Sequence, residues 1–376
     1  MKLNSIGKAL GTTVSATAIA ALTLTACGSD NNASAPSTSA SGTGTGTASA
    51  SADCGGKNAL TAEGSTAQQN AIAEFNKVWG QVCSGKNLSY NPTGSGAGRQ
   101  QFIAKQVDFA GSDSALGKDQ VDPAAQRCGG NPAWNLPLVF GPVAMAYNLE
   151  GVDKLVLNAD VIAKIFQGQI TKWNDPAIAA LNSGATLPST AIQAVHRSDE
   201  SGTTDNFTKY LSKTAKSDWT YDHAKAWKAP GGTGAAKSDG VAALVKSTAG
   251  TIAYVELSFA ENSSLSMAKV KNGAGEFTEL TGDSAGKTIE GAKVVGTGND
   301  LKMDIDYATT TPGAYPIVLV TYEIACSKGS AKAADIKAFL TYTSSSAGQS
   351  VLSDLGYAPL PSSVQSKVAT AVASIS

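Results

Sequence analysis

A turn of glycine, serine and threonine between a strand and a helix recurs three times in this chain, and it limits the possible folds more than any other feature. The fullest copy is the Ser-Gly-Thr sequence of residues 201–203. A β-favouring run at 191–195 precedes it, and Phe207, Tyr210 and Leu211 follow at the spacing of an amphipathic helix. A repeated strand–turn–helix unit indicates an α/β fold, in which such turns gather at one edge of the sheet.

Two further turns of the same composition lie earlier in the chain. Residues 64–67 (Gly-Ser-Thr-Ala) open a helical pattern, and residues 94–98 (Gly-Ser-Gly-Ala-Gly) follow a short strand at 88–90. The next strand, 107–110, is followed by Gly-Ser-Asp, which places the carboxylate of Asp113 at the strand end. The second turn lacks the Gly-Lys-Ser/Thr ending of a nucleotide-binding loop, so the pattern gives little support to a nucleotide site.

Turns of this kind suit an anion, although one Ser-Gly-Thr before a helix is more often a plain helix cap. The first amides of a helix have no partner inside it, and the helix dipole favours negative charge there. Arg197 adds a planar cation that matches a tetrahedral oxyanion. An ionised Asp113 can only accept hydrogen bonds, so it fits an anion that carries a proton, such as phosphate, and repels fully ionised sulfate. The alternative role for Asp113 is a helix cap or a surface salt bridge.

The composition excludes several other classes of protein. A chain of 376 residues allows about two domains. Its net charge of −1 gives no reason to expect a nucleic-acid partner. The two histidines, His196 and His223, do not lie at metal-ligand spacing from a cysteine. We therefore expect no metal and no cofactor.

Residues 262–310 are polar, with weak hairpin signals, and are expected to be irregular.

The N-terminus is predicted to be a lipoprotein signal peptide, residues 1–26. Two lysines precede an apolar, small-residue run at 9–24 that is too short and too rich in serine and threonine for a membrane-spanning helix. The run ends in Leu-Thr-Ala-Cys, which resembles a bacterial lipobox and makes Cys27 the predicted lipidation site; an ordinary signal peptide is the alternative. Residues 27–57 are dominated by small polar residues and are expected to form a flexible tether.

The remaining cysteines fit an exported protein. Four are left when Cys27 is set aside, an even number that suits an oxidising compartment. Two disulfides can then form in three possible connectivities. Of these, we favour the pairing of Cys54 with Cys83 and of Cys128 with Cys326.

Seven motifs occur in a fixed order along the chain and together carry a family resemblance. They are Gly-Ser-Thr-Ala-Gln (64–68), Tyr-Asn-Pro-Thr-Gly-Ser-Gly-Ala-Gly (90–98), Val-Asp-Phe-Ala-Gly-Ser-Asp (107–113), Ile-Thr-Lys-Trp-Asn-Asp (170–175), His-Arg-Ser-Asp-Glu-Ser-Gly-Thr-Thr (196–204), Gly-Thr-Ile-Ala-Tyr-Val-Glu (250–256) and Tyr-Pro-Ile (315–317). The set resembles the phosphate-binding lipoproteins of bacterial high-affinity phosphate ABC transporters, a family of the periplasmic-binding-protein type. The resemblance covers nearly the whole body of the chain.

The resemblance implies a set of ligand residues. Asp113 would accept the phosphate proton, Arg197 would pair with the phosphate charge, and Asp199 would orient Arg197 from behind. The residues implied to bind phosphate are Ser65, Thr66, Ala67, Ser95, Asp113, Arg197, Ser201, Gly202 and Thr203. Two positions depart from the family pattern: Ala67 stands where some relatives have Phe, and Glu200 replaces a frequent Gly and is expected to face solvent.

The resemblance also implies a fold, partners and a location. The fold would be the type II periplasmic-binding-protein fold, with two α/β lobes, the ligand in the cleft between them and two hinge crossings, near 147–151 and 311–315. Residues 58–147 and 315–376 would form lobe 1, and 148–314 lobe 2. The protein would be lipid-anchored on the extracytoplasmic side of the cell membrane and would deliver inorganic phosphate to the permease and ATPase subunits of the transporter.

Two other functions remain open at this point. One is an exported phosphatase or other hydrolase that uses Ser201 or Ser95 as nucleophile, although neither serine lies in Gly-x-Ser-x-Gly. The other is a receptor for a different tetrahedral oxyanion, which the carboxylate of Asp113 disfavours. We expect a binding protein and no enzyme.

Overall fold

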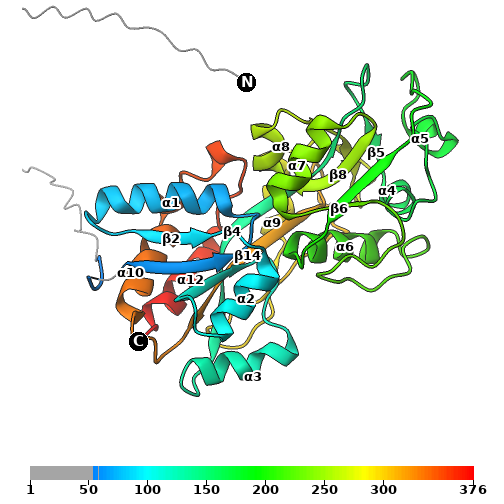
Figure 1. The fold of residues 1–376 in the computed structure, drawn as a ribbon. Coiled ribbons are helices and arrows are strands. Elements are labelled where there is room, and N and C mark those ends of the chain that lie inside the picture. Colours follow the sequence, from blue (N-terminus) through cyan, green and yellow to red (C-terminus); the bar gives the residue numbers. More distant parts are fainter. Residues whose placement is uncertain (1–53, 58) are drawn as a thin grey trace, which may run out of the picture. The chain divides into compact units, whose positions relative to one another are not determined.

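The longest strand, β4 (Ala133–Tyr147), connects the two halves of the main sheet (Figure 1). A computed structural model describes residues 54–57 and 59–376, which belong to one compact unit. β4 pairs antiparallel with β14 (Val318–Cys326) along its first part and with β8 (Thr251–Glu256) along its last part. From Asn135 to Tyr147 every residue of β4 is buried, as a largely apolar run in the middle of a covered sheet requires.

The first half of the sheet lies on the β14 side of β4, in the order β2 (Leu88–Asn91), β1 (Leu60–Gly64), β3 (Phe109–Ser112) and β14. β1 pairs in parallel with both β2 and β3. Helices α1 (Gln69–Val82) and α2 (Ser95–Ile103) are the crossovers that parallel strands need, and α3 (Lys118–Arg127) follows β3. Since the strands are parallel, the turns that follow them reach the same edge of the sheet.

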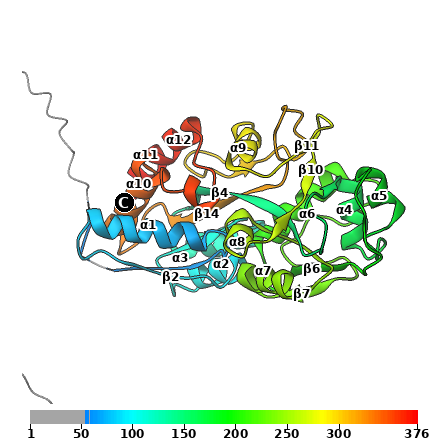
Figure 2. The same ribbon diagram turned by 90° about the horizontal axis from the view of Figure 1, so that it is seen from above.

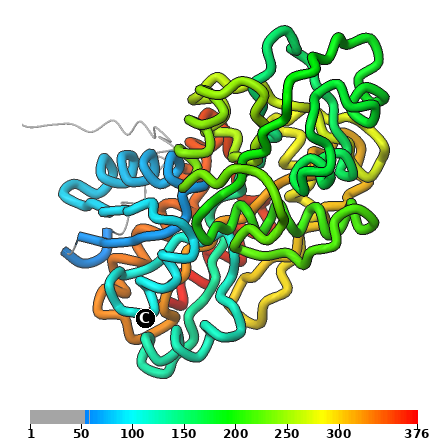
Figure 3. The backbone as a smooth tube through the Cα atoms, turned by 45° about the vertical axis from the view of Figure 1, so that its right-hand side comes forward, coloured from blue at the N-terminus to red at the C-terminus, as the bar shows by residue number. Residues whose placement is uncertain are grey.

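The C-terminal segment packs onto this first half. Its elements are α10 (Ala333–Ser344), α11 (Ser346–Gln349), a 3₁₀ turn (Ser353–Leu355) and α12 (Ser362–Ala373). Trp79 of α1 meets Phe339 of α10 edge-on, with ring centroids 5.1 Å apart. Figure 3 shows the same return of the chain, with the orange and red segments beside the blue ones. The two ends of the described chain therefore share one core.

The second half of the sheet lies on the other side of β4, in the order β8, β6 (Gln193–Arg197) and β7 (Thr233–Ala235), all parallel. Around it lie α4 (Ala159–Phe166), α5 (Pro176–Leu181), α6 (Gly202–Thr214), α7 (Lys237–Ser247) and α8 (Leu257–Asn262). Phe207 of α6 stacks on Tyr254 of β8 at 4.3 Å, which fixes the helix on the sheet. In Figure 2, α4 to α6 lie at the opposite end of the body from α10 to α12. The predicted α/β class is confirmed.

The segment expected to be irregular, 262–310, contains regular structure. β5 (Val156–Leu157), β10 (Lys269–Lys271) and β11 (Phe277–Thr278) form a small sheet, β12 (Lys293–Val294) pairs with β13 (Met303–Asp304), and β9 (Ser266–Met267) joins β4. Helix α9 (Gly282–Glu290) was not expected. Thr281 caps it by accepting from the Ser284 amide at 3.0 Å, and Ala285 and Ile289 are buried. The cap and the apolar spacing were present in the sequence but cover few residues.

Both favoured disulfides are confirmed. Cys54 pairs with Cys83 just after α1, and Cys128 pairs with Cys326 at the end of β14. The second bond joins residues 198 positions apart, so it ties the C-terminal strand to the end of α3.

The predicted signal peptide, Cys27 and nearly all of the predicted tether lie outside the described residues. Within the described part of the chain, none of the helices has the length and apolar character needed to cross a membrane.

Candidate anion-binding site

Asp113, directly after β3, is the centre of the candidate site. Its side chain is 3% exposed and accepts hydrogen bonds from three hydroxyls. Ser65 and Thr321 donate to Oδ1, Thr321 at 2.7 Å, and Ser95 donates to Oδ2 at 3.0 Å. Burial raises the pKa of Asp113 to about 6; the hydroxyls oppose this shift and the charge of Glu256 adds to it. The carboxylate is thus ionised at neutral pH and held by neutral donors.

Hydrogen bonds of Ser65 hold the first turn, residues 65–67, in place. The Ser65 amide donates to the Gly111 carbonyl at 2.8 Å, because the pairing of β1 with β3 continues past Gly64. The Ala67 amide donates to Ser65 Oγ at 3.1 Å. The amides of Ser65 and Ala67, two of the residues implied to bind phosphate, are therefore both engaged within the protein. The Thr66 hydroxyl lies 2.7 Å from Ser238 Oγ, across from the start of α7.

Arg197 ends β6 and supplies the site with a permanent cation that is 3% exposed. Its Nε and Nη2 atoms donate to the two oxygens of Asp199, with Nε at 2.8 Å from Oδ1. Burial alone would raise the pKa of Asp199, but the Arg197 pair outweighs this and holds the pKa below its usual value. The third nitrogen, Nη1, lies 3.5 Å from Thr203 Oγ1 and 3.4 Å from Ser238 Oγ. Asp199 thus fixes the Nε–Nη2 edge of the guanidinium, and Nη1 points toward the hydroxyls of Thr203 and Ser238.

The start of α6 meets the Asp113 segment directly. Ser201 caps the helix through its Oγ, which accepts from the Thr204 amide at 3.3 Å, and its own amide donates to the Lys225 carbonyl at 2.9 Å. A Cβ atom on Gly202 would lie 2.4 Å from Asp113 Cβ, so only glycine allows this approach. Thr203 donates its hydroxyl to Glu256, a buried carboxylate that ends β8.

Four amides of buried residues at these turns have no hydrogen-bond partner among the described residues. They are the N–H groups of Thr66, Ser95, Gly202 and Thr203. Buried amides without partners are rare in native proteins, because each one costs free energy on the order of 1–3 kcal/mol. Convergent donors of this kind beside an arginine are the chemical features of an oxyanion site.

Three residues of the site were missed by the sequence analysis. Thr321 lies inside a uniformly buried strand and gives no local signal. Ser238 opens α7, so its helix start carried the same cue as Ser95 and Ser201. Glu256 is the last residue of β8, so its position at a strand end resembles that of Asp113 and was the cue that went unused.

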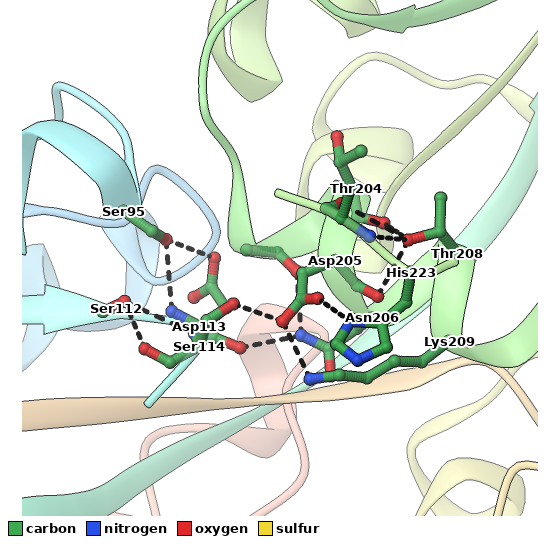
Figure 4. Close-up of polar contacts among 12 residues, drawn as sticks. Ser95, Ser112, Asp113, Ser114, Thr204, Asp205, Asn206, Thr208, Lys209 and His223 are labelled. Atoms are coloured by element: carbon green, nitrogen blue, oxygen red, sulfur yellow. Dashed lines mark hydrogen bonds and ion pairs between the residues drawn. The ribbon is translucent and has the colours of Figure 1, made fainter. Parts of the chain in front are cut away.

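A second polar network, shown in Figure 4, joins the segment after β3 to α6. Asp205 accepts from Ser114 Oγ at 2.6 Å and from Lys209 at 2.8 Å, and its other oxygen lies 2.6 Å from His223 Nδ1. Asn206 donates to the Asp113 carbonyl at 2.7 Å. Burial alone would raise the pKa of Asp205, but its bonds with His223, Lys209 and Ser114 hold the pKa far below its usual value. The two halves of the sheet are therefore in direct contact beside Asp113.

Glu200 adds another contact between the two halves. Its side chain is 41% exposed, but its carboxylate pairs with the fully buried guanidinium of Arg99 on α2. The expectation that Glu200 faces solvent thus describes only part of its surroundings. The carboxylate is committed to Arg99 and does not point freely into the site.

The two serines considered as nucleophiles have other partners. Ser95 Oγ donates to Asp113, and Ser201 Oγ caps α6. His196 contacts the Arg197 carbonyl through Nδ1, and His223 contacts Asp205. Within the described residues no group of three or more His, Cys, Asp or Glu side chains is arranged to hold a metal ion.

Comparison with known proteins places this chain in a family. A family model described as a PBP superfamily domain matches residues 6–347. The phosphate-binding protein PstS 3 of Mycobacterium tuberculosis is 50% identical over 328 residues, which cover 86% of this chain and 88% of that protein.

Two solved structures show the same fold. A high affinity periplasmic phosphate-binding protein, solved with phosphate bound, aligns with a TM-score of 0.69 and 21% identity over 83% of this chain and 93% of its own. The phosphate binding protein of Stenotrophomonas maltophilia aligns with a TM-score of 0.62 and 20% identity over the same shares, 83% and 93%. From the family model and the 50% identity to PstS 3, the chain belongs to the PBP superfamily, as a member of its PstS family of phosphate-binding proteins.

Proposed function

We propose that this chain binds inorganic phosphate at the site around Asp113 and Arg197 and delivers it to an ABC-type phosphate importer. The observation that carries the proposal is the set of four partnerless buried amides at three turns, next to a fixed guanidinium. A tetrahedral oxyanion satisfies such donors, and Arg197 Nη1 contributes the positive charge. The names of the relatives support the same ligand.

Asp113 gives the site its selectivity for phosphate. At neutral pH, phosphate carries at least one proton, which an ionised carboxylate accepts. Sulfate has no proton to donate, so its oxygens would face the Asp113 oxygens and repel them. Ser65, Thr66, Ala67, Ser95, Ser201, Gly202 and Thr203 complete the proposed ligand set, with Asp199 holding Arg197 in place.

The ligand is proposed to join two lobes. Lobe 1 comprises 58–147 and 315–376, lobe 2 comprises 148–314, and the chain crosses between them near 147–151 and 311–315. Asp113 and Ser95 belong to the first half of the sheet, whereas Arg197 and Thr203 belong to the second. An anion that bonds to both halves stabilises the closed arrangement by its own binding free energy.

The proposal extends to the cellular setting. Cys27 is the proposed lipid attachment site, and the residues between it and the disulfide-bonded Cys54 are the proposed tether that holds the body at the extracytoplasmic face of the cell membrane. From there the protein would pass phosphate to the permease and ATPase subunits of the importer. Treatment with a signal-peptidase II inhibitor should leave the precursor unprocessed, whereas normal processing would contradict lipid attachment at Cys27.

The protein is proposed to act without catalysis. Among the described residues, neither Ser95 nor Ser201 hydrogen-bonds to a histidine: the Ser95 hydroxyl donates to Asp113, which is assigned to the phosphate proton, and the Ser201 hydroxyl caps α6. Release of phosphate from a phosphate ester by the purified protein, abolished by Ser95→Ala or Ser201→Ala, would contradict this.

Calorimetric titration tests the binding proposal. The purified protein should bind phosphate, and Arg197→Ala should weaken binding at least about a hundredfold, because it removes charge-assisted bonds worth about 1.5–3 kcal/mol each. Arg197→Lys keeps the charge but loses the fork to Asp199, so it should fall between the two. Absence of phosphate binding in the unmodified protein would refute the proposal.

A further inference from the structure

A buried carboxyl group behind the site is not explained by phosphate binding. Glu323 lies in β14, is 0% exposed, and has no hydrogen-bond donor to either oxygen among the described residues. It stands two residues from Thr321, on the same face of the strand, and Thr321 bonds directly to Asp113. An ionised carboxylate is costly in such a place, because burial removes its water and no cation stands among the groups that act on it.

Gln68, the residue next to Glu323 in space, also has a buried oxygen atom that no donor reaches. The side-chain amide of Gln68 acts on the Glu323 carboxyl, and Gln68 Oε1 is itself buried without a donor. Its Nε2 donates to Tyr90 Oη at 3.2 Å, and Tyr90 in turn donates its proton to the Ser65 carbonyl at 2.7 Å. The second N–H of Gln68 Nε2 is thus the one donor left for three buried acceptor atoms, Gln68 Oε1 and the two oxygens of Glu323.

The strand register builds this cluster. Glu323 pairs with Gly111 across the β14–β3 ladder. A Cβ atom on Gly111 would lie 2.1 Å from Gln68 Nε2 and 2.5 Å from Tyr90 Oη, so the glycine makes room for both groups. Leu136 of β4 pairs with Glu323 on the other side and offers no polar atom of its side chain. One proton on Glu323 would turn an acceptor into the missing donor.

We propose that Glu323 is a neutral carboxylic acid in the folded protein, donates its proton to Gln68 Oε1, and thereby adds no negative charge beside Asp113 to that of Glu256. Glu323 is thus a positioning residue for phosphate affinity. Its effect on affinity rests on the proposed function, whereas its protonation does not.

The titratable groups that act on Glu323 agree with this assignment. Burial raises the pKa of Glu323 to about 8, the Asp113 charge adds to the shift, and the Gln68 amide opposes it. Tyr90 on β2 faces the same cluster, and burial together with Glu323 raises its pKa well above the usual value, so its phenol stays neutral. Above about pH 8, Glu323 loses its proton and a new charge appears beside the phosphate site.

Glu323→Gln is the variant that mimics the neutral acid. Its amide can donate to Gln68 Oε1 at every pH. Phosphate affinity is measured for the full chain and the variant at about pH 7 and about pH 9.5, and the two are compared at the same pH, which cancels the protonation of phosphate itself. We expect equal affinity at pH 7 and a three- to tenfold weaker affinity of the unmodified protein at pH 9.5. Glu74→Gln, which removes a partly exposed carboxylate paired with Lys77, is the matched control and should show no such difference.

Infrared spectroscopy tests the proton without using phosphate. The ligand-free protein at neutral pH should show the C=O stretch of a buried carboxylic acid, and Glu323→Gln should remove that band. Gln68→Met leaves the Glu323 acid in place without its acceptor, so the C=O band should move to higher frequency. This variant tests the protonation of Glu323 even where Glu323→Gln does not fold.

Two results would overturn the proposal: no carboxylic acid band that depends on Glu323, or a ratio of affinities that does not change with pH. If the unmodified protein binds no phosphate at either pH, the proposed function fails, and the infrared band still decides the protonation of Glu323.

Discussion

Asp113 combines deep burial, three hydroxyl donors and no cation among its hydrogen-bonding partners in the described chain. A structural carboxylate in the core usually has a basic partner. Three hydroxyls instead leave its charge only partly offset. This arrangement favours a ligand that brings a proton, and it places selectivity in one side chain.

Replacement of Asp113 by Asn should therefore relax selectivity. The amide can donate to sulfate, so we expect measurable sulfate binding, together with phosphate binding weakened about tenfold by loss of a charged acceptor. Because the pKa of Asp113 is raised to about 6, the unmodified protein should admit sulfate at about pH 5 but not at about pH 7.5. Competition titrations measure both. The control is Asp108→Asn, which changes a carboxylate bonded to Thr61 and Lys332. Continued exclusion of sulfate by Asp113→Asn would refute the role of Asp113 in selectivity.

At the scale of an element, the approach of α6 to Asp113 requires Gly202. An alanine there would place its Cβ 2.4 Å from Asp113 Cβ and 2.8 Å from Asp113 Cα, and the helix start would have to move. We expect Gly202→Ala to cost about 1–3 kcal/mol of stability and at least tenfold in phosphate affinity. Gly240→Ala in α7 has open space and should gain about 0.5–1 kcal/mol without changing affinity. Equal phosphate affinity in the two variants would show that the contact does not matter.

The elements also show what the sequence could predict. The strand–turn–helix repeat predicted the α/β class, and the parallel strands β1, β2 and β3 do bring the turns at Ser65 and Ser95 to one edge, at Asp113. The expectation of a single edge fails for the third turn, because β6 runs opposite to β1 and β3 and its turn reaches Asp113 from the other half of the sheet, through Gly202. Thr321 and Glu323 were unpredictable because their roles depend on the register of β14 against β3, which pairs residues about two hundred positions apart. Local patterns carry no information on such a pairing.

At the scale of the whole molecule, two raised carboxyl pKa values make stability depend on pH. The folded state retains a proton on Asp113 up to about pH 6 and on Glu323 up to about pH 8, whereas the unfolded chain releases both near pH 4. Stability should therefore be greatest at the acidic end of this window and fall as pH rises toward 8. Asp205, whose pKa is lowered, acts with the opposite sign and only below about pH 4.

Denaturant unfolding of the ligand-free protein at about pH 5, 6.5 and 8 measures this dependence. We expect the free energy of unfolding to decrease by up to about 1.4 kcal/mol per pH unit from Glu323 alone. Glu323→Gln should flatten the profile above pH 6. A profile that rises from pH 5 to 8 in the unmodified protein would contradict the assignment.

Nuclear magnetic resonance can observe the four partnerless amides themselves while phosphate is added. In the nitrogen-15 spectrum of the protein, the N–H signals of Thr66, Ser95, Gly202 and Thr203 should shift downfield with phosphate and stay in place with sulfate at about pH 7.5. Phosphate binding that leaves these four signals unchanged, or no response to phosphate, would contradict the account of this site.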